Sequence, residues 1–494
     1  MRPDPRVPTL LGAVWARLRR PPARGAPQAT SSSAEGVRPS SRLEFDDHRA
    51  VFRHKSTWEL LRGLLVLRVC GADAVAANAL KIFRLGHRLL GERVLGWLLR
   101  PTVYAQFVAA GGRRDGTPPT EREDLEAAAA SLETLGLRLM VAPTLEGDVG
   151  EGGRDDLYNR NLQELLQLAE WAWEFGGGGC QRKPCLQVKA TALLSADVLK
   201  ILARHYDESC ELEKIKLVNT LAATALTTSE TTVASCGIAA LSQDLNEAIY
   251  KGVRRLGHLG AAAQRRGMTL LLDAEYSYVN GAVSLLALAA MSVYNKDLPI
   301  VCNTIQCYFK EAKSNLEREL KIAEHLGLCY GAKIVRGAYL EQERSIELKN
   351  GPSLTCSSHE ETGQNYNQVV SRFLMHAAGK PASRCLVIIA THNEAAICYA
   401  IDALHALGLS PLSGPVAFAQ IYGMAEQISM PLVRGGYVVY KSVPAGGRLW
   451  QVLPYLARRA AENRSVLRGA RRERELLQQE LLWRLRGRWR VVPG

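Results

Sequence analysis

The chain has 494 residues, of which 47% are hydrophobic and 22% charged, and a formal net charge of +13. This composition excludes a disordered or fibrous protein and fits one large folded domain or two ordinary ones. The charge sits at the two ends: residues 1–42 hold eight Arg against two acidic residues, and residues 464–490 hold nine Arg against three. Nucleic-acid binding would need basic residues across a folded face, so the near-neutral remainder argues against a nucleic-acid partner.

The first segment, residues 1–42, is rich in Arg, Pro, Ala and Ser and contains no Lys. That pattern is typical of a mitochondrial transit peptide, whereas a secretory signal would need a clean apolar core after its charges. The alternative is an untargeted disordered tail. We therefore expect import into the mitochondrion.

A helical arm and a series of short apolar runs follow. Residues 43–120 combine helical spacing of apolar residues with a final Gly/Pro break, which predicts an N-terminal helical arm. Eight apolar runs then alternate with helical stretches, at residues 137–144, 186–192, 268–275, 299–306, 332–338, 386–392, 416–423 and 436–444.

Continuous apolar runs that alternate with helices are typical of parallel βα units, and eight of them predict an α/β fold of the (β/α)₈ barrel type. We place the barrel at residues 121–463. The stretch 193–267 exceeds one crossover connection, which predicts a helical insertion there. Residues 464–494 are expected to form a basic C-terminal helix or tail.

Two other kinds of site are not predicted. The eleven Cys include no CxxC pair, and the pairs Cys180/Cys185 and Cys302/Cys307 lack the second half of a zinc site, so we expect reduced thiols and no metal. Residues 276–295 carry no charge, but Ser and Asn interrupt them, which favours a buried helix over a membrane span.

Polar side chains gather where the predicted strands end, which is where a barrel of this type forms its active site. Lys189 lies in an apolar strand, and because a buried ammonium without a partner is costly, Asp273 on a neighbouring strand is its expected partner. His392 by itself would more often be a hydrogen-bonded structural residue.

The last helical segment before the tail carries four polar residues on one face. Tyr455, Arg458, Arg459 and Glu462 are spaced 0, 3, 4 and 7. Two guanidiniums beside one Glu suit a carboxylate ligand, which Arg binds with two parallel hydrogen bonds. The alternative is a solvated face of salt bridges.

Four segments together resemble the proline dehydrogenase family. They are residues 334–339 (IVRGAY), 390–393 (ATHN), 418–424 (FAQIYGM) and 455–463 (YLARRAAEN). The resemblance covers roughly residues 43–485 with the motifs in the family's order. It implies a distorted (β/α)₈ TIM-like barrel that holds FAD non-covalently.

The resemblance also implies roles for individual residues. Arg458, Arg459 and Glu462 would grip the carboxylate and ring amine of a cyclic amino acid. Tyr339 and Tyr455 would wall its ring, Ile421 would form an apolar side, and Lys189 and Asp273 would line the floor. The flavin would be held by Gln306, Lys333, Arg336, Gly337, Thr391, His392, Asn393 and Gln420. Lys333 stands where bacterial relatives place an Arg near the flavin.

The implied reaction passes a hydride from the ring carbon beside nitrogen to flavin N5, and the electrons go on to ubiquinone. Where proline-specific members carry a Tyr, this chain has Ser442. A Tyr there would crowd a 4-hydroxyl group, whereas Ser leaves room and offers a donor and an acceptor. The resemblance is therefore to the branch that converts trans-4-hydroxy-L-proline to 1-pyrroline-3-hydroxy-5-carboxylate, with weaker activity on L-proline.

Two alternatives stay open on the sequence. One is an L-proline dehydrogenase in which Ser442 is a neutral substitution. The other is a catalytically inactive barrel that binds membranes through its C-terminal end, where Trp483 and Trp489 stand among Arg residues. In the favoured hypothesis the same end makes peripheral contact with the matrix side of the mitochondrial inner membrane.

Overall fold

A computed structural model of the chain describes residues 43–108, 120–145, 155–177, 183–226, 235–350, 353–410, 415–446, 452–453, 455–457 and 470–489. The predicted transit segment, residues 1–42, lies outside the described residues.

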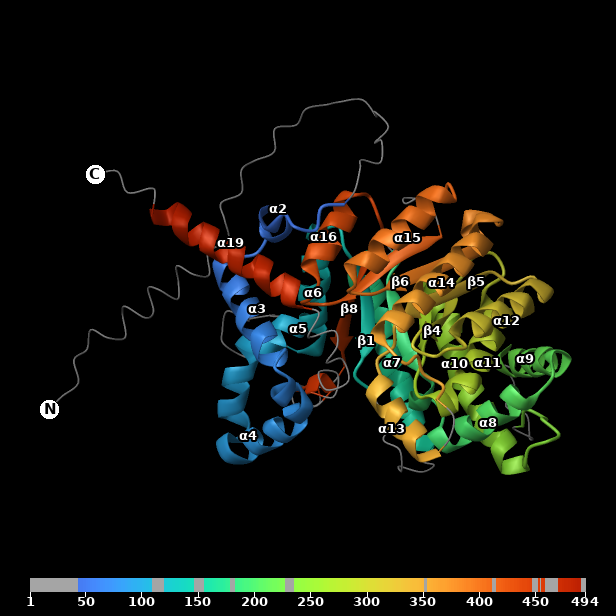
Figure 1. Cartoon of the computed structure of the whole chain (residues 1–494). Helices are drawn as coiled ribbons and strands as arrows, with labels where there is room; N and C mark the ends of the chain where they lie inside the picture. The colour runs from blue at the N-terminus through green and yellow to red at the C-terminus, as the bar shows by residue number, and fades with distance from the viewer. Residues whose placement is uncertain are drawn as a thin grey trace.

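The centre of the molecule is a closed barrel of eight parallel strands in the order β1 to β8 (Figure 1). The strands are β1 (Arg138–Pro143), β2 (Cys185–Lys189), β3 (Thr269–Asp273), β4 (Val301–Gln306), β5 (Tyr330–Val335), β6 (Cys385–Ala390), β7 (Val416–Ile421) and β8 (Val439–Ala445). Strand β8 pairs with β1 and closes the ring. Each predicted run overlaps one strand, so the predicted (β/α)₈ barrel is confirmed. Several predicted boundaries were wrong by one to three residues. The largest errors at a carboxyl end are at β5, which ends at Val335, and at β2, which ends at Lys189 because Ala190–Ala192 turn into a short 3₁₀ helix.

Helices cover the barrel, and their apolar faces pack on the outward-facing strand residues. They are α6 (Glu121–Thr134), α7 (Asp155–Phe175), α8 (Ala196–Glu208), α9 (Glu211–Leu226), α10 (Gln243–Arg266), α11 (Ser277–Tyr294), α12 (Ala312–His325), α13 (Leu340–Asn350), α14 (His359–Ala378), α15 (Glu394–Ala406) and α16 (Glu426–Arg434), with a 3₁₀ turn at Ala382–Arg384. Helices α8, α9 and α10 all stand between β2 and β3, which is the predicted insertion. Helix α11 is long and apolar enough to span a bilayer, yet residues such as Leu285 and Leu288 are fully buried inside the protein.

The strand pleat divides the barrel interior into an apolar lower part and a polar upper part. Alternate residues of a strand point to the same face. In the lower part Met140, Cys185, Leu271, Ile388 and Tyr440 pack together. Two positions further toward the carboxyl end, the inward side chains of β2, β3 and β8 are polar, namely Gln187, Asp273 and Ser442. The barrel thus has a filled base and an open, polar mouth.

The N-terminal arm forms a lobe beside the barrel. It contains α2 (His48–Phe52), α3 (Thr57–Cys70), α4 (Asp73–Leu99), a π-helical turn (Arg100–Tyr104) and α5 (Ala105–Phe107). Helix α4 bends sharply at Gly91, whose φ of 70° and ψ of 170° are not helical, so α4 forms the hairpin that projects at the lower left of Figure 1. Leu95 of its second half lies beside Gly86 of its first half.

The last helix, α19 (Arg471–Trp489), packs along α2 and α3. Glu480 accepts a hydrogen bond from Nδ1 of His48 at 2.8 Å and pairs with Arg484 at 2.6 Å. Arg484 also donates to the carbonyl oxygens of Phe52 and Lys55. Arg484, predicted to face a membrane, is therefore engaged in joining the two ends of the chain.

Candidate active site

A cavity of about 700 Å³ opens at the carboxyl ends of the strands, between the barrel and the α3–α4 lobe. Thirteen of the seventeen side chains predicted for the site line it: Lys189, Asp273, Gln306, Lys333, Arg336, Gly337, Tyr339, Thr391, His392, Gln420, Ile421, Ser442 and Tyr455. The period-two pleat explains this convergence, because the residues that end neighbouring parallel strands face one mouth.

The floor of the cavity is a chain of four hydrogen-bonded side chains from four strands. Gln187 Nε2 donates to Ser442 Oγ at 2.8 Å, and Lys333 Nζ donates to Gln187 Oε1 at 2.7 Å. Lys333 Nζ also pairs with Asp273 Oδ1 at 2.5 Å. Lys333 is 6% exposed, and its two acceptors offset the cost of burying the ammonium. An ammonium can only donate, so Gln187 turns its amide oxygen toward Lys333 and therefore its NH₂ group toward Ser442.

The ion pair found for Asp273 differs from the one expected. Lys189 and Asp273 are register partners on β2 and β3, as predicted, and both line the cavity. However, the salt bridge of Asp273 is made with Lys333 from β5, two strands further round the barrel. Lys333 was predicted as a flavin residue, and the structure shows that it organises the floor.

One wall of the cavity follows β5. Tyr339 is buried and packs against Tyr276, with ring centroids 4.7 Å apart. Arg336 donates to the carbonyl oxygen of His359 at 2.9 Å, and its partly buried guanidinium lines the cavity. Gly337 has a φ of 115°, in a region that side-chain-bearing residues rarely adopt. A cation and an aromatic ring are thus held at one wall by a glycine turn.

The opposite wall follows β6 and β7. His392 Nε2 accepts a hydrogen bond from the Ile421 amide at 3.0 Å. Enclosure by protein and the nearby Lys441 ammonium lower the pKa of His392 to about 3. The ring is therefore neutral at physiological pH, and its Nδ1–H is left as a donor on the cavity wall. Gln420 is fixed by Ser429 Oγ, which donates to its Oε1 at 2.9 Å.

Asn393 has a different part in the structure from its neighbours in the ATHN segment. Its side chain accepts from the Ala396 amide at 2.9 Å and so caps α15. It is absent from the described lining of the cavity. Arg458, Arg459 and Glu462 lie outside the described residues, so their predicted grip on a carboxylate and an amine stays a prediction.

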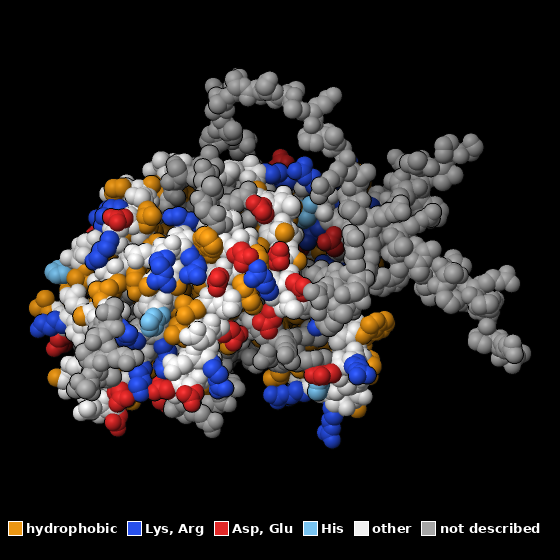
Figure 2. Space-filling model, turned by 180° about the vertical axis from the view of Figure 1, so that it is seen from behind, with side chains coloured by type: hydrophobic (Ala, Val, Ile, Leu, Met, Phe, Trp, Pro, Cys, Tyr) orange, Lys and Arg blue, Asp and Glu red, His pale blue; other side chains and the backbone are white. Residues whose placement is uncertain are grey.

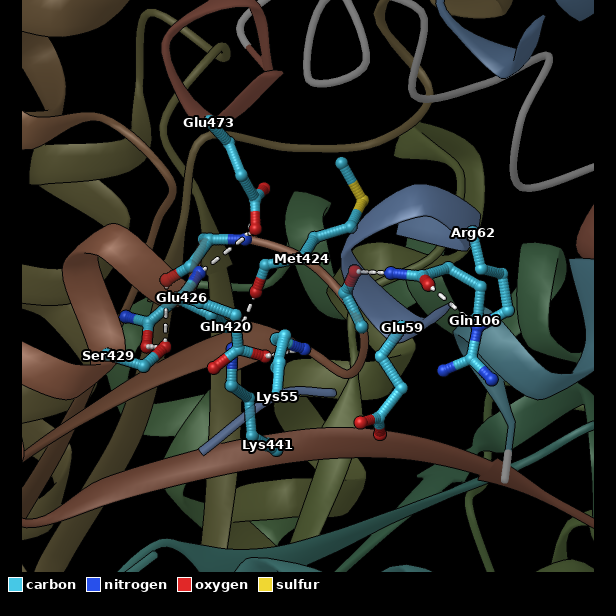
Figure 3. A network of polar contacts seen from close by, with 12 residues as sticks. Lys55, Glu59, Arg62, Gln106, Gln420, Met424, Glu426, Ser429, Lys441 and Glu473 are labelled. Atoms are coloured by element: carbon cyan, nitrogen blue, oxygen red, sulfur yellow. Dashed lines mark hydrogen bonds and ion pairs between the residues drawn. The ribbon is translucent and has the colours of Figure 1, made fainter. Parts of the chain in front are cut away.

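The loop Tyr422–Ala425, which follows β7 and contributes Met424 to the cavity, is held from three directions (Figure 3). Gln106 of α5 donates to the Gly423 carbonyl at 2.5 Å, and Lys441 of β8 donates to the Met424 carbonyl at 2.5 Å. Glu473 of α19 accepts from the amides of Ala425 and Glu426, at 2.7 and 3.2 Å. The C-terminal helix therefore caps the start of α16 and fixes the loop beside the site.

A buried charge cluster underlies this loop (Figure 3). Lys441 is 1% exposed, and its Nζ lies 3.7 Å from Glu426 Oε1, which Lys55 of the arm approaches to 3.8 Å. Burial alone would raise the pKa of Glu426, but the two ammoniums bring it down to about 2. Burial and the neighbouring Glu426 charge raise the pKa of Glu473. Glu426 is thus ionised at neutral pH.

Sequence reasoning missed two inward-facing residues of the site. Gln187 stands two positions before Lys189, and Thr304 two before Gln306, so both share a face with residues that were predicted. Thr304 Oγ1 is buried and has no hydrogen-bond partner among the described residues. Extending the period-two pattern inward from each strand end would have found them.

Comparison with known proteins identifies the family. The family model described as proline dehydrogenase matches residues 126–472. The chain belongs to the proline dehydrogenase family. As a member of the proline dehydrogenase family it is a dehydrogenase, and the resemblance noted in the sequence is confirmed.

Curated relatives in this family differ in how similar they are to the chain. The hydroxyproline dehydrogenase of Xenopus laevis is 35% identical, over 97% of this chain and 97% of that protein. The hydroxyproline dehydrogenase of Rattus norvegicus is 37% identical, over 90% and 95%. Human proline dehydrogenase 1, mitochondrial, is 28% identical over 96% and 95%. The relatives named for hydroxyproline are thus the more similar of these.

A solved structure shares the fold. Proline utilization A from Bdellovibrio bacteriovorus, inactivated by N-propargylglycine, superposes with a TM-score of 0.57 and 19% identity. The match covers 85% of this chain and 39% of that chain. Within the described residues, no group of three or more His, Cys, Asp or Glu is placed to hold a metal ion.

Proposed function

We propose that the protein is an FAD-dependent hydroxyproline dehydrogenase that converts trans-4-hydroxy-L-proline to 1-pyrroline-3-hydroxy-5-carboxylate. The observation that carries the proposal is the floor of the cavity, where Ser442 stands in a polar network instead of an aromatic ring. The names of the more similar curated relatives support the same substrate.

The cavity has donors of the kind that a flavin requires. A planar ring with carbonyl oxygens and a diphosphate needs hydrogen-bond donors and a cation. The lining supplies the Arg336 guanidinium, the amides of Gln306 and Gln420, and the Nδ1–H of neutral His392. Thr304 Oγ1 is a further polar atom at the cavity, and it is buried without a hydrogen-bond partner among the described residues. These residues would hold FAD, which supplies the two-electron redox chemistry when bound.

The remaining residues would bind and orient the substrate. Tyr339 and Tyr455 are both buried at the cavity and would exclude water from the ring of the amino acid. Arg458, Arg459 and Glu462 would pair with its carboxylate and amine. Loss of a hydride from the ring carbon and a proton from nitrogen turns the C–N bond into C=N.

The floor network explains why a 4-hydroxyl group would be recognised. Gln187 Nε2 occupies one lone pair of Ser442 Oγ, so the Ser442 hydroxyl hydrogen must point elsewhere. It is then available to the hydroxyl group of a substrate, and the second lone pair of Oγ can accept in return. A site that hydrogen-bonds a substrate hydroxyl discriminates against the analogue that lacks it.

Ser442→Tyr tests this assignment. The variant is expected to lower kcat/KM for hydroxyproline relative to proline by about 10-fold or more, because the phenol fills the space and removes the hydroxyl contact. The measurement is kcat/KM for both substrates with a water-soluble dye as acceptor. Ser442→Ala serves as the control, since it removes the hydroxyl without adding bulk. Equal or better turnover of proline by the unaltered enzyme would contradict the substrate assignment and favour an L-proline dehydrogenase.

Gln187 is expected to act as a positioning residue for Ser442. Gln187→Met keeps the volume but removes both hydrogen bonds to the floor, so kcat/KM for hydroxyproline should fall about 10-fold while that for proline changes less. A purely structural role would lower both activities equally. Comparing the ratio of the two substrates in Gln187→Met and Gln187→Glu separates the two roles.

The flavin itself is tested by the absorption spectrum of the purified protein. A yellow protein whose spectrum bleaches on addition of hydroxyproline is the expected result. A colourless protein that takes up no FAD would overturn the proposal and leave an inactive barrel.

The proposal also covers the location of the enzyme in the cell and its electron acceptor. The mitochondrial name of a family relative and the Arg-rich residues 1–42 support a mitochondrial location, at the matrix side of the inner membrane. The acceptor is proposed to be ubiquinone. The amino acid loses two electrons and two protons, and a quinone that gains the same number becomes a quinol, so the reaction balances.

A further inference from the structure

The outer surface of the α4 hairpin is apolar. Seven large hydrophobic side chains between residues 82 and 98 are exposed, and Leu89 and Trp97 are 72% and 77% exposed. They form one stripe on each half of the hairpin, since their spacing is 0, 3, 7, 8 before the bend and 0, 3, 4 after it. The stripes are Ile82, Leu85, Leu89 and Leu90, and then Val94, Trp97 and Leu98. Such concentration on a projecting element marks an interaction surface.

Cations stand beside this apolar surface. Lys81, Arg84, Arg88 and Arg93 are all exposed on α4, against a single nearby acid, Glu92. In Figure 2 the lobe at the lower right carries Lys and Arg side chains next to hydrophobic ones. Apolar side chains flanked by cations, with an exposed Trp, suit the interface of an anionic bilayer.

The same helix forms the apolar side of the cavity. Val75, Ala79, Phe83 and Gly86 line the cavity from one face of α4, opposite the polar strand ends. Ile82 and Leu90 line the cavity and are also 50% and 46% exposed. The rim of the cavity is therefore continuous with the exposed apolar surface.

We propose that the α4 hairpin inserts its apolar surface into an anionic phospholipid membrane and that a lipid-soluble quinone reaches the site through the cavity beneath α4. This rests on the proposed function, because it supplies the route for the acceptor. A quinone that stays between apolar side chains avoids exposing its hydrocarbon tail to water. We place the membrane contact on α4 and not on α19, because the guanidinium of Arg484 in α19 donates to carbonyl oxygens of the protein itself.

A second copy of the chain fits this surface less well than a membrane does. Two hairpins packed face to face would bring four cations of each copy together, and like charges in contact oppose association. An anionic bilayer neutralises the same charges, and each Lys or Arg near such a surface strengthens binding about 5-fold.

The test uses the flavin-loaded enzyme and sedimentation with phosphatidylcholine vesicles, with or without phosphatidylserine. Leu89→Glu/Trp97→Glu removes apolar contact, and Arg84→Gln/Arg88→Gln/Arg93→Gln removes charge. Neither variant touches a cavity-lining residue. Leu212→Glu/Leu226→Glu, at two exposed Leu of α9, which lies on the side of the barrel away from α4 (Figure 1), is the matched control.

The unaltered enzyme and the control are expected to bind the anionic vesicles. The charge variant should bind on the order of 100-fold more weakly, and Leu89→Glu/Trp97→Glu should not bind. With a quinone of long isoprenoid tail in the vesicles, both α4 variants should lose most of their turnover. With a water-soluble dye their turnover should be unchanged, which shows that they are folded.

The contrary outcomes are distinct. Equal vesicle binding by all four proteins, or none by the unaltered enzyme, overturns the inference. Dimers in light scattering that dissociate in Leu89→Glu/Trp97→Glu, without vesicle binding, would assign the surface to a second copy. Absence of dye reduction by the unaltered enzyme overturns the proposed function instead, whatever the vesicles show.

Discussion

Replacing Lys441 with Met is expected to lower the free energy of unfolding by about 3 kcal/mol, the lower end of the range for breaking a buried ion pair. The substitution keeps most of the volume but leaves the Glu426 carboxylate buried without its nearer ammonium. Lys55, at 3.8 Å, still offsets part of the charge. The measurement is urea-induced unfolding at neutral pH.

Two comparisons separate charge from packing. Lys380→Met removes an exposed cation that pairs with Glu324 at 3.4 Å, and should cost less than about 1 kcal/mol. Lys441→Met/Glu426→Gln should recover part of the loss, because no uncompensated charge stays buried. Equal losses for Lys441→Met and Lys380→Met would show that the buried pair adds nothing beyond a surface one.

The pH dependence has a definite sign. The pKa of Glu426 is lowered from 4.5 to about 2 in the folded protein. Its contribution to stability is therefore complete above pH 4.5 and is lost as the pH falls from there toward about 2. In Lys441→Met that pKa should rise, so acid should reduce stability less steeply over this interval.

Replacing Gly337 with Ala is expected to cost about 3 kcal/mol or more of stability, for two reasons that add. The φ of 115° is strained for any residue with a Cβ, and a Cβ there would lie 1.8 Å from two ring carbons of Tyr308. Tyr308 is 1% exposed, so its ring has no space into which it could move. The protein should also retain less flavin, because Arg336 precedes the strained residue.

Gly408→Ala is the matched control for this substitution. Gly408 also has a positive φ, 65°, but no atom lies within 4 Å of the added Cβ, so a cost of about 1 kcal/mol is expected. Adding Gly337→Ala to Tyr308→Ala should cost only the backbone strain, because the clash has gone and the cavity left by the tyrosine is common to both proteins. Similar unfolding midpoints for Gly337→Ala and Gly408→Ala would contradict the close approach to Tyr308.

The barrel could be predicted from the sequence because its strands are buried on both faces. Such strands read as continuous apolar runs, and their polar ends, as at Lys189 and Asp273, stand out against them. A continuous apolar run does not, however, show which side chains at its end point into the barrel and which point outward. Lys441 and Ser442 are adjacent at one strand end, yet Ser442 lines the cavity while Lys441 points away into the charge cluster.

Contacts between distant segments could not be predicted in the same way. The salt bridge between Asp273 and Lys333 passes over β4 to the strand beyond it, so which cation Asp273 meets depends on side-chain reach as well as strand order. Glu473 lies in a segment whose charge suggested a solvated or membrane-bound tail, although its carboxylate is buried. The overall charge count also concealed the cations of α4, because acids elsewhere in the chain cancel them.

The cap that Glu473 places on α16 affects the order in which the protein can be completed. A chain is synthesised from its amino end, and domains begin to fold as they emerge. All eight strands precede Glu473, so the barrel can close before the carboxylate that fixes the Tyr422–Ala425 loop exists. The N-terminal helices α2 and α3 likewise cannot make their contacts with α19 until the C-terminal residues have been synthesised. The cavity mouth is therefore among the last parts of the molecule to be finished during biosynthesis.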